Sequence, residues 1–256
     1  MVSDYYDFQT EISPLGELYA AAHFNLIGSR EYPIDPEIIA AKYHGLEIRP
    51  VAGLSTVNVK AGIDATQSVL FIDSDLYTKD NLQYLARQTI AHELGHIIFD
   101  SPAIRQNAPS TAQESFAAHT VLTSRNGVES RANMFAGAFL VPRHELIRKS
   151  ATIIFSSLPD LKQQYPHMRI QDMMFALAAS KLTNQFDVSD SLIEWRLRQE
   201  NVAALFGGAD ARVEEIDELV LGRFAETSHP ETHDLAERVK RLLPPELTLF
   251  LKEAGM

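Results

Sequence analysis

The chain has 256 residues, 45% of them hydrophobic and 22% charged, which is the composition of a globular protein with a substantial core. It contains no cysteine, so disulfides and cysteine-based metal sites are excluded, and its net charge of −11 argues against a broad nucleic-acid-binding surface. The N-terminus lacks the basic start and apolar core of a signal peptide and no apolar run reaches 18 residues, so we expect a cytoplasmic protein that does not enter a membrane.

Two short helices are predicted ahead of a small sheet. Ser13 is expected to cap the first helix, with Pro14 in its first turn and Gly28 just after its end. The same signals place a second helix between Asp35 and Gly45. Alternation of apolar and polar residues then predicts three strands, at 46–51, 55–60 and 68–73.

A long uninterrupted helix is predicted over 80–99. Gly95 weakens it by about 1 kcal/mol relative to alanine, which suggests that another backbone approaches closely at this position. The polar, proline-containing stretch 100–126 is predicted to be a mobile loop. Another helix follows over 127–140 and is ended by Pro142.

The rest of the chain is also predicted to be helical. A helix begins near Arg143, and 170–205 has the pattern of a helix, a turn and a second helix capped by Ser189. Residues 160–205 contain five basic and six acidic side chains, which gives no basic face, so direct DNA binding is not expected. The tail 209–256 is predicted to be helical with proline interruptions.

The long helix carries the motif His92-Glu93-Leu94-Gly95-His96. Residues four apart lie on the same face of a helix, so His92 and His96 can bind one Zn²⁺ ion together. Glu93 is offset toward the open coordination position, where it can take a proton from the attacking water. The alternative is a solvated helix face with two unrelated histidines, and the amphipathic helix around the motif favours the metal site.

Two histidines need a third protein ligand, and the next helix offers Glu129. Asn133 lies one turn further on the same face and can hydrogen-bond a ligand imidazole. The small residues Ala132 and Ala136 flank this face and would let the two helices approach closely. Alone, Glu129 would be explained as a carboxylate favoured by the helix dipole, but beside the histidine motif it is the expected ligand.

The motif HELGH followed by ESRANMFAGAFLVP at 129–142 resembles the ImmA/IrrE family of metallopeptidases. The similarity extends over about 15–200, from the capped helix IDPEIIAAKYHGL to the segment LAASKLTNQFDVSDSLIEWRL. It implies an α+β fold that is mostly helical, with a thermolysin-like minimal metalloprotease core, a small β-sheet and a helical segment after it. It also implies zinc ligation by His92, His96 and Glu129, with Glu93 as general base.

The resemblance implies a zinc-dependent endopeptidase that cleaves a repressor of the helix-turn-helix type and so relieves repression, for example after stress. The alternative is a zinc-containing regulatory protein that binds and sequesters such a repressor without cutting it. The expected organisation is a metalloprotease core at 1–150, a helical segment at 151–208 and a helical tail at 209–256.

Other candidate residues are weaker. His144-Glu145-Leu146 begins like a second motif, but Arg148 stands where its second histidine would be. His229 and His233 are four apart in a proline-interrupted segment and are interpreted as a surface pair. The group that stabilises the transition-state oxyanion stays open among three residues: Tyr77, His119 and Arg131.

Overall fold

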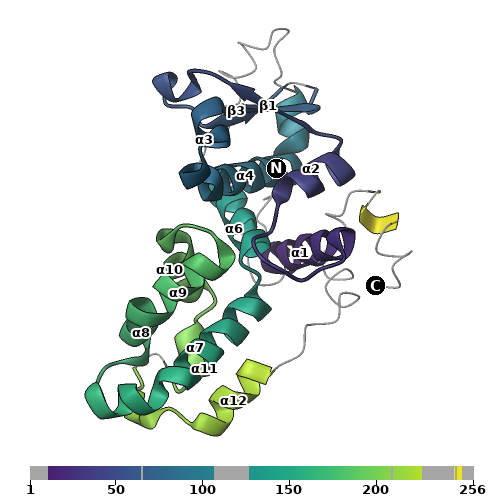
Figure 1. The fold of residues 1–256 in the computed structure, drawn as a ribbon. Coiled ribbons are helices and arrows are strands. Elements are labelled where there is room, and N and C mark those ends of the chain that lie inside the picture. The colour runs from purple at the N-terminus through teal and green to yellow at the C-terminus, as the bar shows by residue number, and fades with distance from the viewer. Residues whose placement is uncertain are drawn as a thin grey trace. The chain divides into compact units, whose positions relative to one another are not determined.

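The described residues form two compact units: unit 1 contains those up to Leu140 together with 245 and 247–249, and unit 2 contains those from Val141 to Glu226. The computed structural model (Figure 1) describes residues 11–64, 66–106, 127–208, 210–226, 245 and 247–249. Residues 107–126, which include His119 and most of the predicted loop, lie outside this description, as does most of the predicted tail. The predicted fold class is confirmed, because the described residues are mostly helical and include a small three-stranded sheet.

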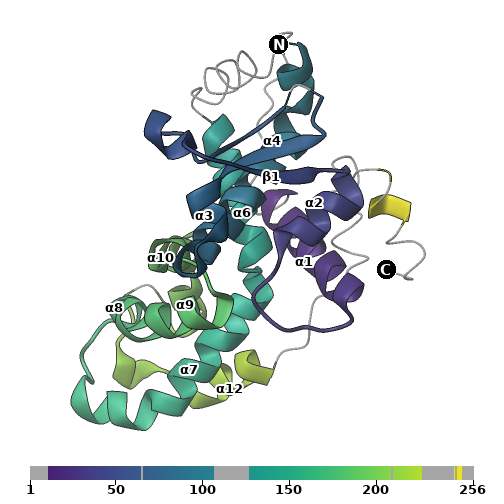
Figure 2. The ribbon, with the colours of Figure 1, turned by 45° about the horizontal axis from the view of Figure 1, so that its top comes forward.

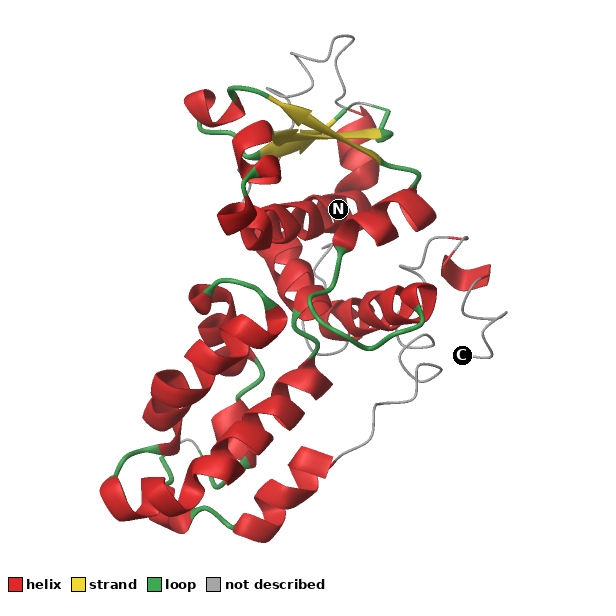
Figure 3. Ribbon diagram, viewed as in Figure 1, coloured by secondary structure: helices red, strands yellow, loops and turns green. Residues whose placement is uncertain are grey.

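The described part of unit 1 contains the sheet and the helices around it. Its helices and strands are α1 (Ser13–Ile27), α2 (Pro36–His44), β1 (Glu47–Val51), β2 (Ala61–Ile63), β3 (Val69–Asp73), α3 (Ser74–Thr78), α4 (Gln83–Gln106) and α6 (Val128–Leu140). Figure 3 shows the three strands together, with helices against them. Short 3₁₀ helices occur at Leu54–Val57 and Asp80–Leu82.

The sheet has the strand order β1-β3-β2. β1 runs parallel to β3, with Arg49 opposite Phe71, whereas β2 runs antiparallel to β3, with Gly62 opposite Phe71. Apolar side chains of β2 and β3 pack with Ala86 and Ile90 of α4 in one buried cluster. This packing holds α4, the helix that carries the histidine motif, against the sheet.

Helix α6 lies beside both α1 and α4 (Figures 1 and 2), and a glycine makes each contact close. A Cβ atom at Gly95 would lie 2.8 Å from the Cα of Ala132, and one at Gly16 would lie 2.5 Å from the Cβ of Ala138. The close approach predicted from Gly95 and Ala132 is therefore confirmed. It fixes the distance between the helices that carry His92 and Glu129.

Three details of the predicted elements are wrong. Ser13 is the first residue of α1 rather than its cap, because Ile12 stands at the cap position with helical φ and ψ. The stretch 55–60 is not a strand, because Gly53 and Asn58 adopt positive φ and enclose a 3₁₀ turn whose Ser55 amide donates to Asp73. The long helix ends at Gln106, beyond the predicted Phe99.

Several predicted boundaries are confirmed. Asp35 caps α2 by accepting a hydrogen bond from the Glu37 amide, and Gly28 and Gly45 end their helices with positive φ. In unit 2 Ser189 caps its helix by accepting from the Leu192 amide. In each case the residue type predicted the backbone geometry.

Unit 2 is helical. Its elements are α7 (Arg143–Gln164), α8 (Ile170–Met173), a π-helical turn (Met174–Ala179), α9 (Ser180–Phe186), α10 (Asp190–Gln199), α11 (Val202–Leu205), a 3₁₀ turn (Val213–Glu215) and α12 (Glu218–Glu226). Helix α7 packs against α12 and α9. None of the helices in the described part of the chain has both the length and the apolarity needed to cross a bilayer.

Candidate metal centre

Helix α4 places His92 and His96 on one face, as their spacing predicts. Their Nε2 atoms lie 3.0 Å apart, and the two rings meet nearly edge to face with centroids 4.7 Å apart. His96 is fully buried, while the side chain of His92 is 19% exposed. One imidazole therefore lies inside the unit and the other at its surface.

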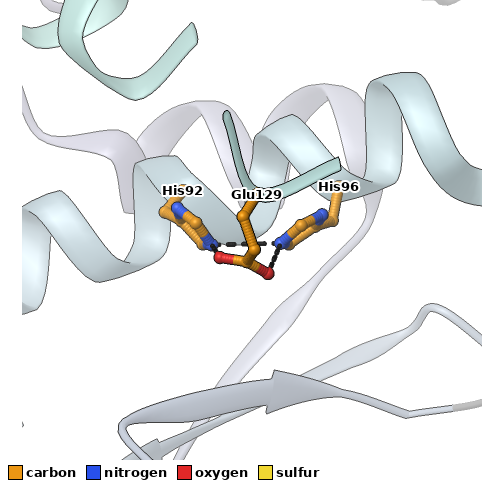
Figure 4. Close-up of side chains that lie close together, drawn as sticks. All are labelled: His92, His96 and Glu129. Carbon is orange, nitrogen blue, oxygen red and sulfur yellow. Dashed lines mark hydrogen bonds and ion pairs between the residues drawn. The ribbon is translucent and has the colours of Figure 1, made fainter. Parts of the chain in front are cut away.

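Glu129, in the first turn of α6, completes the group (Figure 4). Its Oε2 atom lies 3.2 Å from Nε2 of His92, and its Oε1 atom lies 3.3 Å from Nε2 of His96. The ligand atoms of these three residues all lie within 4.8 Å of one another. The structure thus brings Glu129, which follows His96 by 33 residues, to the two histidines of the neighbouring helix, and the three side chains could hold a metal ion.

The second nitrogen of each imidazole has its own partner. Nδ1 of His92 lies 2.9 Å from Oδ1 of Asn133, and Nδ1 of His96 lies 3.1 Å from Oδ2 of Asp100. A carbonyl or carboxylate oxygen accepts the Nδ1–H hydrogen, which leaves the Nε2 lone pair free to bind a metal. Both imidazoles are therefore held in the tautomer that metal binding at this point requires.

Asp100 is the site residue that sequence reasoning missed. Its signal was present, since it stands four residues after His96 and the helix continues past it. Arg131, two residues after Glu129, donates from Nη2 to Oδ1 of Asp100. Helix α6 thus contributes Glu129, Arg131 and Asn133 to one network around the histidines of α4.

The electrostatics of the site favour positive charge at its centre. Burial lowers the pKa of His96, but its hydrogen bonds to Asp100 and Glu129, together with the charges of Glu93 and Glu129, outweigh burial and raise the pKa to about 9. Hydrogen bonds from His92 and His96 hold the pKa of Glu129 far below its usual range, against the effect of burial. Both shifts have the same meaning: positive charge on His96 and negative charge on Glu129 stabilise each other at this point.

The spacing of these atoms fits zinc. Ligand atoms at about 2.0–2.2 Å from a tetrahedral Zn²⁺ are about 3.3–3.6 Å from one another. The two Nε2 atoms lie 3.0 Å apart, and each lies 3.2 or 3.3 Å from a different oxygen of Glu129, so the separations are at or slightly below that range. Two imidazoles and one carboxylate are also the donor set of catalytic zinc sites, which keep a fourth position open.

The remaining candidates that the structure describes have partners of their own. The hydroxyl of Tyr77 donates to Glu37 at 3.0 Å, and Arg131 is engaged with Asp100. In the decoy motif of α7, Glu145 pairs with Arg148 at 2.8 Å. His119, His229 and His233 lie outside the described residues.

The three-stranded sheet packs against the helix that carries the HExxH motif, and a carboxylate of a neighbouring helix completes the possible metal site. These features are typical of a metallopeptidase. Comparison with protein families agrees: residues 41–165 match the model of the IrrE N-terminal-like domain, peptidase family M78. The matched residues include the three possible metal ligands and their hydrogen-bond partners, and the match supports a metallopeptidase of the ImmA/IrrE type. No curated protein and no solved structure matched the chain.

Proposed function

We propose that the protein is a zinc-dependent endopeptidase whose metal is held by His92, His96 and Glu129. The observation that carries the proposal is the convergence of their three ligand atoms, with each imidazole turned by a partner on its other nitrogen. Without a cation, three electron-pair donors would face one another at 3.0–3.3 Å and a proton would have to separate them. A metal ion at this point satisfies all three.

Glu93 is the proposed general base. It follows His92 directly in α4 and is only 5% exposed, and its charge helps to raise the pKa of His96, which supports a place for its carboxylate near the metal ligands. When bound, zinc would supply Lewis acidity that lowers the pKa of water and polarises the scissile carbonyl. Glu93 accepts the proton of the attacking water and then donates it to the leaving amine.

The proposed substrate is a protein, specifically a repressor of the helix-turn-helix type, as the family resemblance implies. An extended segment can pair with the edge of a sheet through backbone hydrogen bonds, whatever its side chains. The outer strands β1 and β2 provide such edges in unit 1. We propose that the scissile segment binds at a sheet edge in this way and that cutting the repressor relieves repression.

The test compares the wild type with Glu93→Gln, which keeps the size and polarity of the side chain but removes the base. Each protein is incubated with zinc and with helix-turn-helix repressors from its own genome, and fragments are identified by mass spectrometry. We expect Glu93→Gln to bind zinc normally and to cleave about 10²–10⁴-fold more slowly. Glu31→Gln, a charge-matched change at an exposed position of unit 1, should cleave at the wild-type rate.

The outcome separates a protease from a sequestering protein. If Glu93→Gln releases the repressor from DNA as fully as the wild type, and no fragments appear with either protein, the peptidase proposal is wrong. Sequestration without cleavage would then explain the regulation.

A further inference from the structure

The two candidate ligand histidines have unequal partners. His92 faces the neutral amide of Asn133, whereas His96 faces the carboxylate of Asp100. The side chain of Asp100 is 9% exposed, and that of His96 is 1% exposed. A hydrogen bond to a charged acceptor is about twice as strong as one between neutral groups, so His96 is held more firmly than His92.

Asp100 is itself fixed from the second helix. Its Oδ2 atom accepts from His96, while its Oδ1 atom accepts from the guanidinium of Arg131 on α6. Both oxygens are thus occupied, so the carboxylate cannot turn without breaking one of these contacts.

The contacts connect the two helices at two levels. Glu129 of α6 meets both imidazoles at their Nε2 atoms, and Arg131 of α6 reaches the far side of His96 through Asp100. His96 is therefore held on one side by Glu129 and on the other by Asp100, which Arg131 fixes in place. The close approach of Gly95 and Ala132 keeps Glu129 and Arg131 at a constant distance from α4.

We propose that Asp100, held by Arg131, is the positioning residue for His96 and makes it the stronger of the two imidazole ligands. The carboxylate fixes the Nδ1–H tautomer, orients the ring and increases the electron density that Nε2 offers to the metal. This inference rests on the proposed function only in that the site binds zinc. It makes no demand on the substrate or on cleavage.

The test measures zinc affinity by competition with a chromophoric chelator, with no substrate present. Loss of an outer partner of a ligand histidine typically weakens metal binding 10–100-fold, and we expect Asp100→Ala to fall in that range. Asp100→Asn keeps the size and a hydrogen-bond acceptor but not the charge, so we expect a smaller loss of about 3–10-fold. Asn133→Ala should cost less than Asp100→Ala.

A second readout separates positioning from a general loss of stability. In the zinc-loaded protein labelled with ¹⁵N-histidine, the Nδ1–H signal of His96 should shift in Asp100→Asn, while that of His92 stays in place. Asp80→Ala, at an exposed position of the same unit, is the matched control and should change neither the affinity nor the spectrum. Arg131→Gln should weaken zinc binding in the wild type but have little further effect in Asp100→Asn, because its action passes through Asp100.

The outcomes distinguish this inference from the proposed function. If Asp100→Ala and Asp100→Asn bind zinc within twofold of the wild type and the His96 signal is unchanged, the positioning role is wrong while the zinc site stands. If Asp100→Ala does not fold, the Asp100→Asn affinity and spectrum decide the question alone. If the wild type does not bind zinc, the proposed function and this inference both fail.

Discussion

Each unit contains a cluster of charged or ionisable side chains, and the two clusters differ in how their charges are balanced. In unit 2, Arg196 and Glu200 are fully buried and pair at 2.8 Å, Arg143 reaches the same carboxylate at 2.9 Å, and Nε of Arg196 donates to the Val141 carbonyl. Opposite charges meet directly there, so this cluster is complete by itself.

The cluster of unit 1 is different, because three possible metal ligands meet at its centre. Two imidazole nitrogens and a carboxylate converge on one point, and each is an electron-pair donor once it is deprotonated. Such a group is stable only with a proton or a metal ion between its members. Buried charge alone therefore does not indicate a candidate metal site, whereas the convergence of several electron-pair donors does.

The largest expected effect comes from removing a donor in unit 1. His92→Ala leaves two ligands on the metal, and we expect zinc affinity to fall by more than about 100-fold, since even outer partners are worth 10–100-fold. Equilibrium dialysis measures the change. A zinc affinity within tenfold of the wild type would show that His92 is not a metal ligand, and it would contradict the difference drawn between the two clusters.

The matching change in unit 2 should affect stability and leave zinc binding unaltered. Glu200→Ala leaves the guanidinium of Arg196 buried without its carboxylate, which should lower the free energy of unfolding by about 3–5 kcal/mol. Trp195 of α10 is the chain's single tryptophan, so its fluorescence in a urea titration reports on this unit.

The control for that experiment is an exposed ion pair of the same unit. Arg169 and Asp172 pair at 2.9 Å with side chains 56% and 51% exposed, and Asp172→Ala should cost less than about 1 kcal/mol. A loss of equal size in both variants would show that burial does not distinguish the two pairs. A change of zinc affinity in Glu200→Ala would contradict the independence of the two clusters.

A smaller effect is expected at the contact between α4 and α6. Helix propensity alone predicts that Gly95→Ala stabilises the protein by about 1 kcal/mol. The new methyl group would lie 2.8 Å from the Ala132 backbone, so we expect destabilisation of about 1–3 kcal/mol and weaker zinc binding as Glu129 moves away from the histidines.

Gly222 of α12 provides the matched control, because a Cβ atom there would have nothing within 4 Å. Gly222→Ala should stabilise the protein by up to about 1 kcal/mol, as propensity predicts. Thermal unfolding of both variants gives the two signs. Stabilisation by Gly95→Ala would mean that the helices can separate freely at this point.

The smallest expected effect is on the pH dependence of unit 1. Asp73 accepts hydrogen bonds from the Ser55 amide and from the Asp75 and Leu76 amides at the start of α3, and these bonds hold its pKa below the usual 3.8, against burial. Its stabilisation is therefore fully present above about pH 4 and is lost as pH falls through the lowered folded pKa.

We expect this contribution to be about 1 kcal/mol or less, close to the value of a helix cap. It is measured as the difference in amide exchange of β3 between the wild type and Asp73→Asn from pH 3 to pH 6. A difference that grows as pH falls would contradict the assigned sign.

Local signals in the sequence were sufficient for much of the fold. Asp35 and Gly45 define α2 because capping and positive φ depend on one or two residues. The stretch 55–60 was mispredicted because its alternation is that of a strand, while the hydrogen bond from the Ser55 amide to Asp73 depends on a residue 18 positions further along the chain. The extent of β2, only three residues long, depended on its pairing with β3.

The candidate site was predictable to the extent that helical spacing determines it. The pairs His92–His96 and Glu129–Asn133 follow from a separation of four residues, and Gly95 indicated where the two helices approach each other. Asp100 was missed because it was assigned to a loop, so its helical spacing from His96 was not considered. The clamp by Arg131 needs the register between α4 and α6, which no local pattern specifies.

We propose that His92, His96 and Glu129 form one metal site. X-ray absorption at the zinc edge of the loaded wild-type protein measures the ligands of the metal directly. We expect one zinc per chain, coordinated by nitrogen and oxygen atoms at about 2.0–2.2 Å, with two imidazoles among the ligands. In Glu129→Ala one oxygen of that shell should be lost or replaced by solvent. A wild-type protein that retains no zinc, or a shell without two imidazoles, would contradict the account.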